Sequence, residues 1–151
     1  MEAGEYAGLG FQFHYNGIVG VDLDKAIDDG GDVRGWAQGI VEKLNSYTEY
    51  SVSGKGLHVF VRGDLPVDGR RKKLSDIGEG IELYKAKRYF AMTGNVYHAA
   101  PISQRQEELT AVYEQYFPVV KAAPVAVPPP KVPTVGKDYF AIGLERDVKF
   151  R

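Results

Sequence analysis

The stretch Ile18-Val19-Gly20-Val21-Asp22-Leu23-Asp24 (IVGVDLD, residues 18–24) decides how the rest of the chain is interpreted. It predicts a buried strand, because apolar residues fill most of it and an Asn-Gly turn signal precedes it. Asp22 and Asp24 lie two residues apart, so the two-residue period of a strand places both carboxylates on one face. Two like charges side by side cost Coulomb energy in a low-dielectric setting. A function that needs paired acids would account for this arrangement.

The composition limits the class of protein. A chain of 151 residues with 44% apolar and 26% charged residues matches one soluble globular domain. No apolar run is long enough to span a bilayer and the acidic N-terminus is unlike a signal peptide, so we expect a cytoplasmic protein with no membrane partner. The absence of cysteine excludes disulfides, zinc–thiolate sites and cysteine nucleophiles.

The charges are unevenly distributed although their sum is only −1. Acids dominate residues 2–32, where Lys25 is the single base, and bases outnumber acids over residues 55–88. Such an asymmetry suits a site that holds cations beside a polyanion, although solvated surfaces show it as well.

Periodicity predicts an α+β fold for residues 1–117. The expected elements are a β-hairpin (9–24), a helix (32–45), two strands joined by a glycine turn (48–62), two further strands (80–95) and a second helix (103–117). Asp32 is the expected N-cap of the first helix. Two helices on one antiparallel sheet form a sandwich of the split-βαβ kind.

The character of the chain changes after Phe117. Residues 118–136 contain six of the eight prolines and predict a stiff, extended linker. Residues 137–151 predict a short amphipathic helix, which would be poorly stable alone. We expect it to begin a further module of a longer protein.

Paired acids on a strand indicate metal chemistry. Carboxylates of an Asp-x-Asp strand can share two divalent ions about 3.5 to 4 Å apart. Glu82 in GIELY is the other acid that we place inside an apolar strand pattern, so Asp22, Asp24 and Glu82 are the candidate ligands. Any one of them could instead cap a turn or a helix.

The segment SVSGKGLH (residues 51–58) supplies candidate anion-binding residues that complement the candidate metal ligands. Ser53 and Lys55 lie in a small-residue turn whose backbone N–H groups and cation suit a triphosphate, and His58 follows on the next strand. The spacing of a Walker loop is absent. His58 could also be a core histidine with a structural partner.

A run of four bases, GRRKK, occupies residues 69–73. We interpret it as a loop between the histidine strand and the Glu82 strand, close to the site. Its side chains would contact template phosphates or the incoming triphosphate, although a charged loop can also simply face water. The bases are Arg70, Arg71, Lys72 and Lys73.

In this order, the motifs VGVDLD, SVSGKGLHVFV and GIELYKAKRYFAMTGN resemble the catalytic core of the archaeo-eukaryotic primase superfamily, specifically the primase-polymerase domains of phages and plasmids. The resemblance covers about residues 4–117. It implies an RRM-like antiparallel sheet with helices packed on it. Family members usually carry several dozen residues before the first hairpin, and the tail at 138–151 resembles the start of a helical region that leads to a helicase.

The resemblance also implies an activity, namely metal-dependent nucleotidyl transfer by a DNA-dependent primase and polymerase. Its substrates would be dNTPs or NTPs, its partners a single-stranded DNA template and a helicase domain or protein, and its cofactors two Mg²⁺ or Mn²⁺ ions. In this chain the implied metal ligands are Asp22, Asp24 and Glu82, and the implied nucleotide contacts are His58, Ser53, Lys55, Arg88, Thr93 and Asn95.

Three other functions remain open on the residues alone. A rolling-circle replication endonuclease uses a related sheet, but it needs two histidines flanking one hydrophobic residue, and the HVF segment offers only His58. A non-catalytic RNA-binding module would place aromatic residues where the acids lie. A metal-dependent nuclease could use the same acids.

Overall fold

The acidic stretch forms the central strand of a six-stranded antiparallel sheet in the computed structural model, which describes residues 8–119. This strand, β2, lies between β4 and β6 in the order β5-β6-β2-β4-β3-β8. A second, two-stranded sheet pairs β1 with β7. The elements are β1 (Leu9–His14), β2 (Ile18–Asp24), α1 (Gly35–Leu44), β3 (Thr48–Tyr50), β4 (Leu57–Arg62), β5 (Gly69–Lys73), β6 (Gly80–Tyr84), β7 (Ala86–Met92), β8 (Val96–His98) and α2 (Gln106–Tyr116).

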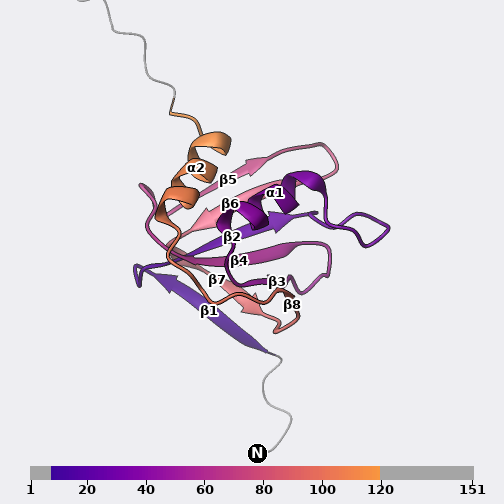
Figure 1. The fold of residues 1–151 in the computed structure, drawn as a ribbon, viewed down its shortest axis with the longest axis horizontal. Helices are drawn as coiled ribbons and strands as arrows, with labels where there is room; N and C mark the ends of the chain where they lie inside the picture. The colour runs from indigo at the N-terminus through magenta and orange to yellow at the C-terminus, as the bar shows by residue number, and fades with distance from the viewer. Residues whose placement is uncertain (1–7, 120–151) are drawn as a thin grey trace, which may run out of the picture. The chain divides into compact units, whose positions relative to one another are not determined.

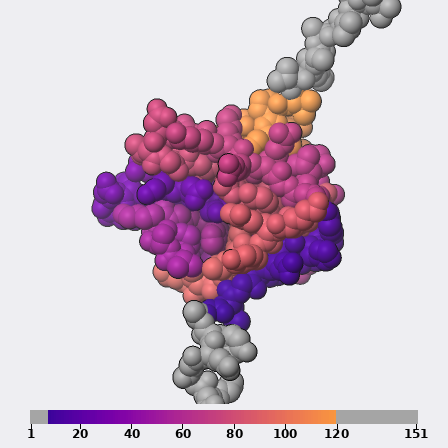
Figure 2. Space-filling model, turned by 180° about the vertical axis from the view of Figure 1, so that it is seen from behind, coloured from indigo at the N-terminus to yellow at the C-terminus, as the bar shows by residue number. Residues whose placement is uncertain are grey.

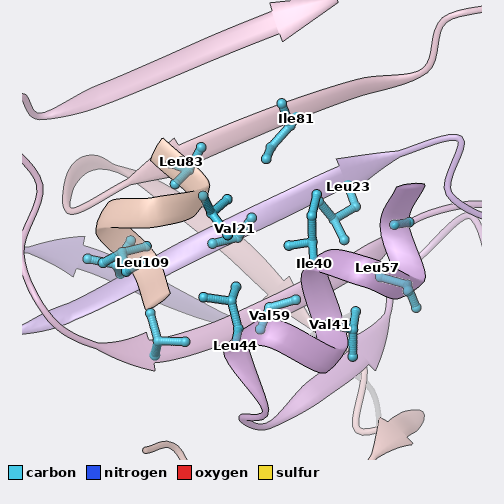
Figure 3. Close-up of a cluster of buried hydrophobic side chains, with 14 of the residues drawn as sticks. Val21, Leu23, Ile40, Val41, Leu44, Leu57, Val59, Ile81, Leu83 and Leu109 are labelled. Atoms are coloured by element: carbon cyan, nitrogen blue, oxygen red, sulfur yellow. The ribbon is translucent and has the colours of Figure 1, made fainter. Parts of the chain in front are cut away.

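Both helices cover one face of the large sheet (Figure 1). Alternate residues of the strands point toward them, and Val21 of β2 and Val59 of β4 are fully buried there. Ile40 of α1 and Leu109 of α2 pack into the same cluster, as Figure 3 shows. This apolar burial stabilises the fold and leaves the other residues of each strand on the opposite face.

The β1–β7 ribbon covers part of that opposite face, which Figure 2 views with β7 in salmon beside β1 in indigo. Phe13 of β1 and Phe90 of β7 pack against Phe60 of β4 in a second buried cluster. Gly20 makes this possible, because a Cβ there would lie 2.2 Å from Cζ of Phe13 and 2.5 Å from Cε2 of Phe90. The ribbon therefore rests directly on the backbone of β2.

The expected α+β architecture is confirmed, but four local predictions are wrong. Residues 9–24 are not a hairpin: β1 pairs with β7, and the turn at Asn16-Gly17 leads from one sheet to the other. The strands β6 and β7 likewise belong to different sheets, and the predicted basic loop is the edge strand β5. Asp32 does not cap α1, because the backbone N–H of Arg34 first bonds to the carbonyl of Ala26 and the helix begins at Gly35.

Some predictions lie outside the described residues. They are the linker at 118–136, apart from Pro118 and Val119, and the helical segment at 137–151. Among the helices of residues 8–119, none has the length and apolar character needed to cross a bilayer.

Candidate active site

One row of directly opposed residues crosses the sheet on the face away from the helices. Asp22 of β2 is the register partner of both Glu82 on β6 and His58 on β4. Glu82 in turn faces Arg71 on β5, and His58 faces Glu49 on β3. Because side chains of directly opposed residues emerge on the same face, five chemically active groups from five strands lie side by side.

The acids of this row repel each other. Burial, with the neighbouring carboxylates of Asp24 and Glu82, raises the pKa of Asp22 to about 7, and the nearby Arg88 guanidinium offsets only part of this rise. Burial and Glu82 also raise the pKa of Asp24. Burial and mutual repulsion thus both disfavour the ionised forms of Asp22 and Asp24.

This donor set fits divalent metal ions. Asp22, Asp24 and Glu82 offer oxygen ligands, which Mg²⁺ and Mn²⁺ prefer, and bound cations would relieve the repulsion that raises the pKa of Asp22. Within residues 8–119, no group of three or more potential ligands converges closely enough to hold an ion as it stands. The fit thus rests on the donor chemistry, the common face and the mutual repulsion of the carboxylates.

Tyr84 and Arg88 hold Glu82 in place. The hydroxyl of Tyr84 donates a hydrogen bond of 2.6 Å to Oε2 of Glu82, and Nη2 of Arg88 lies 3.6 Å from the same oxygen. The Arg88 guanidinium also lies 5.1 Å from the centre of the Tyr84 ring. The Tyr84 ring fits here because its register partner on β5 is a glycine. A Cβ at Gly69 would lie 2.3 Å from Cδ1 of the ring.

His58 is almost fully buried, with 7% of its surface exposed. Its ring stacks on Phe90 at a centroid distance of 4.6 Å, and Nε2 lies 3.7 Å from Oδ1 of Asp22. Nδ1 is buried without a hydrogen-bond partner and lies 4.0 Å from Oε1 of Glu49. Burial lowers the pKa of His58, whereas the Glu49 carboxylate and the Ala91 carbonyl oppose that shift. Nε2 therefore faces Asp22, whereas Nδ1 faces Glu49.

The turn between β3 and β4 is organised by its own serines. Ser53 Oγ accepts a hydrogen bond from the Lys55 backbone N–H, and Ser51 Oγ accepts one from the Gly56 N–H. Lys55 Nζ lies 3.7 Å from Oδ1 of the exposed Asp29. Because both side chains are well exposed, this ion pair is weak and leaves Lys55 free to bind an anion.

Thr93 and Asn95 form a turn that is tied to β3. The hydroxyl of Thr93 donates to the Tyr50 carbonyl and accepts from the Asn95 N–H. The Asn95 carbonyl accepts a hydrogen bond from the Tyr50 N–H. The Thr93 hydroxyl therefore has a structural role, and this turn offers a ligand mainly the side chain of Asn95.

The four bases of β5 divide between the two faces of the sheet. Arg70 and Lys72 oppose Leu83 and Ile81, whose side chains belong to the core beneath the helices. Arg71 and Lys73 lie on the other face, the face of the acids. A cleft of about 220 Å³ lies at this edge of the sheet, and Lys72 borders it together with Arg71 and Lys73. Its other lining residues are Asp24, Gly78, Glu79, Gly80 and Glu82.

Glu49 and Tyr84 belong to the site but were not predicted from the sequence. Glu49 is fully buried within β3, so Glu82 is not the only other acid in an apolar strand. Its position between Thr48 and Tyr50 in a predicted strand was the available signal. Tyr84 was missed because nothing in the sequence marks its hydrogen bond to Glu82.

Comparison with known proteins finds a phage protein that is similar to most of this chain. No protein-family model matches the chain. A DNA primase-polymerase of Nitratiruptor phage NrS-1 is 34% identical to it over 123 residues, which is 80% of this chain. The matched region is 17% of that protein, so the chain spans about a sixth of the length of its relative.

Proposed function

We propose that this chain is a nucleotidyltransferase domain of the phage primase-polymerase kind, which extends a primer or an initiating nucleotide on a single-stranded DNA template. The observation that carries the proposal is the row in which Asp22 stands directly between Glu82 and His58. Candidate ligands for cations and a candidate phosphate contact are thereby adjacent on one face of the sheet.

Asp22, Asp24 and Glu82 would hold two divalent ions, Mg²⁺ or Mn²⁺, which supply a more acidic attacking hydroxyl and charge neutralisation for the triphosphate. The chain's own residues then bind and orient the substrates. Tyr84 and Arg88 keep the Glu82 carboxylate on the acidic face. Positioning and electrostatics of this kind account for most of the catalysis in phosphoryl transfer.

His58 is the proposed phosphate contact nearest to the acids. Its stacking on Phe90 fixes the plane of the ring, and its Nε2 points toward Asp22 rather than into the core. A fixed ring loses little freedom when a ligand binds, which favours affinity. Ser53 and Lys55 of the adjacent turn, with Arg88 and Asn95, are the further proposed nucleotide contacts.

Arg71 and Lys73 are the proposed phosphate contacts on the other side of the acids. Arg71 opposes Glu82, and Lys73 opposes Gly80, which itself pairs with Asp24. Lys73 bonds only to the exposed Asp76, an ion pair that solvent screens. We assign these two bases to substrate or template phosphate. We expect Arg70 and Lys72 to contribute less, because both oppose core residues of β6, although Lys72 also borders the cleft.

A primer-extension assay with the full chain tests the proposal. A primed single-stranded DNA, dNTPs or NTPs, and Mg²⁺ or Mn²⁺ should give a longer primer, and Asp22→Asn/Asp24→Asn should abolish extension. Glu107→Gln, on the exposed side of α2, is the matched control that keeps activity. Shortening of the primer would instead indicate a nuclease. Template binding with neither extension nor cleavage would indicate a non-catalytic module, and either result would overturn the proposal.

A further inference from the structure

Glu49 is a buried carboxyl group that the proposed function does not yet use. It is fully buried on β3, directly opposite His58. Burying a carboxylate is costly unless hydrogen bonds and nearby positive or polar groups compensate for the lost water. The contacts of Glu49 therefore indicate what it does.

Both oxygens of Glu49 accept hydrogen bonds from the turn after β7. Oε1 accepts one from the Thr93 N–H at 2.9 Å, and Oε2 accepts one from the Gly94 N–H at 3.1 Å. Oε2 also accepts one from the hydroxyl of Tyr47 at 2.9 Å. One side of the carboxylate thus holds the turn that contains Asn95.

The other side of Glu49 faces His58. Oε1 lies 4.0 Å from Nδ1, and that nitrogen is buried without a hydrogen-bond partner. A carboxylate oxygen on this side of the ring favours a proton on Nδ1, which leaves Nε2 toward Asp22.

We propose that Glu49 is a positioning residue that joins His58 and the Thr93–Asn95 turn into one nucleotide-binding unit. The carboxylate orients the imidazole through Nδ1 and fixes the turn through two backbone N–H groups. This inference rests on the proposed function in one respect, namely that the ligand held by the unit is a nucleoside triphosphate. The link between Glu49 and His58 does not depend on that function.

Glu49→Gln tests the inference, because the amide keeps the size of the side chain. Its NH₂ group, however, would face the N–H and O–H donors that now bond to the carboxylate. Nitrogen-15 NMR of the histidine ring at pH 8 should show the neutral His58 proton on Nδ1 in the wild-type chain. In the variant this preference should be lost. The Kd for dNTP, measured by calorimetry with Mg²⁺ present, should rise about tenfold, the lower end for partners that orient a functional histidine.

Tyr47→Phe is the matched control, because it removes a donor to Oε2 and leaves Oε1 facing His58. It should change neither the ring proton nor the nucleotide Kd. In primer extension, Glu49→Gln should raise KM for dNTP more than it lowers kcat. If Glu49 has a purely structural role, Glu49→Gln should lower only the Tm. The position of the His58 ring proton and the dNTP Kd of the folded variant would then be unchanged, and that result would overturn the inference.

The wild-type spectrum keeps the test decisive if Glu49→Gln does not fold. A neutral His58 that carries its proton on Nε2 would by itself refute the inference. Failure of the proposed function looks different: the wild-type chain would then neither bind dNTP nor extend a primer, while the ring proton of His58 would still depend on Glu49.

Discussion

Asp22 Oδ1 lies 3.7 Å from His58 Nε2, and the two residues are direct partners on adjacent strands. The other neighbour of Asp22 across the sheet is Glu82, so the carboxylate has an acid on one side and an imidazole on the other. Burial, with the carboxylates of Asp24 and Glu82, raises the pKa of Asp22. Asp22 is the residue whose substitution tests the electrostatics of the site most directly.

We expect Asp22→Asn to stabilise the metal-free protein at high pH. Because the pKa of Asp22 rises from 3.8 to about 7 on folding, the native state binds the proton more tightly than the unfolded state. Wild-type stability should therefore fall as pH rises from about 4 to about 7. Full ionisation costs at most roughly 4 kcal/mol at 1.36 kcal/mol per pKa unit.

Urea unfolding with EDTA at pH 4 and pH 8 measures this difference. The variant should be more stable than wild type at pH 8, and the gain should shrink at pH 4. A gain of equal size at both values would contradict the electrostatic origin.

Mn²⁺ should raise the Tm of the wild-type chain, because an ion that binds only the folded state stabilises it. Asp24→Asn and Glu82→Gln each remove a charged ligand and should reduce this increase. Glu107→Gln, on α2, should leave it unchanged. Differential scanning fluorimetry over a range of Mn²⁺ concentrations is sufficient, and an equal increase in all four proteins would argue against a site at these acids.

Arg71→Ser/Lys73→Ser should weaken phosphate binding more than Arg70→Ser/Lys72→Ser, since only the first pair shares the face of the acids. If both residues contact strand phosphates, the slope of log K for single-stranded DNA against log salt should flatten by roughly 1.4. If they contact the triphosphate, the slope stays the same and the nucleotide Kd rises. Equal losses in the two double variants would show that the sheet does not separate these bases.

His58→Ala should reduce both stability and nucleotide affinity, because the ring is buried against Phe90 and also faces the site. The lost packing is expected to cost about 1 to 3 kcal/mol. Phe90→Leu is the comparison that loosens the stack but keeps the imidazole. Calorimetric titration of the folded variants should show the larger rise in nucleotide Kd for His58→Ala; a comparable rise in both would make the histidine a packing residue only.

Gly20→Ala should destabilise the protein by about 1 to 3 kcal/mol, the usual cost of overpacking a core. The added methyl group would collide with the rings of Phe13 and Phe90 and push the β1–β7 ribbon off β2. Chemical denaturation measures the loss. Gly39→Ala in α1, where a Cβ meets no atom within 4 Å, is the control that should not destabilise.

The sequence alone determined the main elements and the chemistry of the central strand. The alternation in residues 18–24 placed Val21 in the core and both aspartates on the opposite face, because that alternation is a local property of an extended chain. The apolar faces of both helices followed from their 3.6-residue period. The motifs also carried the family resemblance, which the phage relative confirms.

Tertiary structure decided which strands pair and in which register. Residues 9–14 form a strand as predicted, but their partner is β7, about 80 residues away, because the Phe13–Phe90 cluster packs over Gly20. Register alone places Arg71 rather than Arg70 opposite Glu82, and it brings Glu49 opposite His58. A shift of one residue in pairing would move each side chain to the other face of the sheet, and only the complete hydrogen-bonded sheet selects one register.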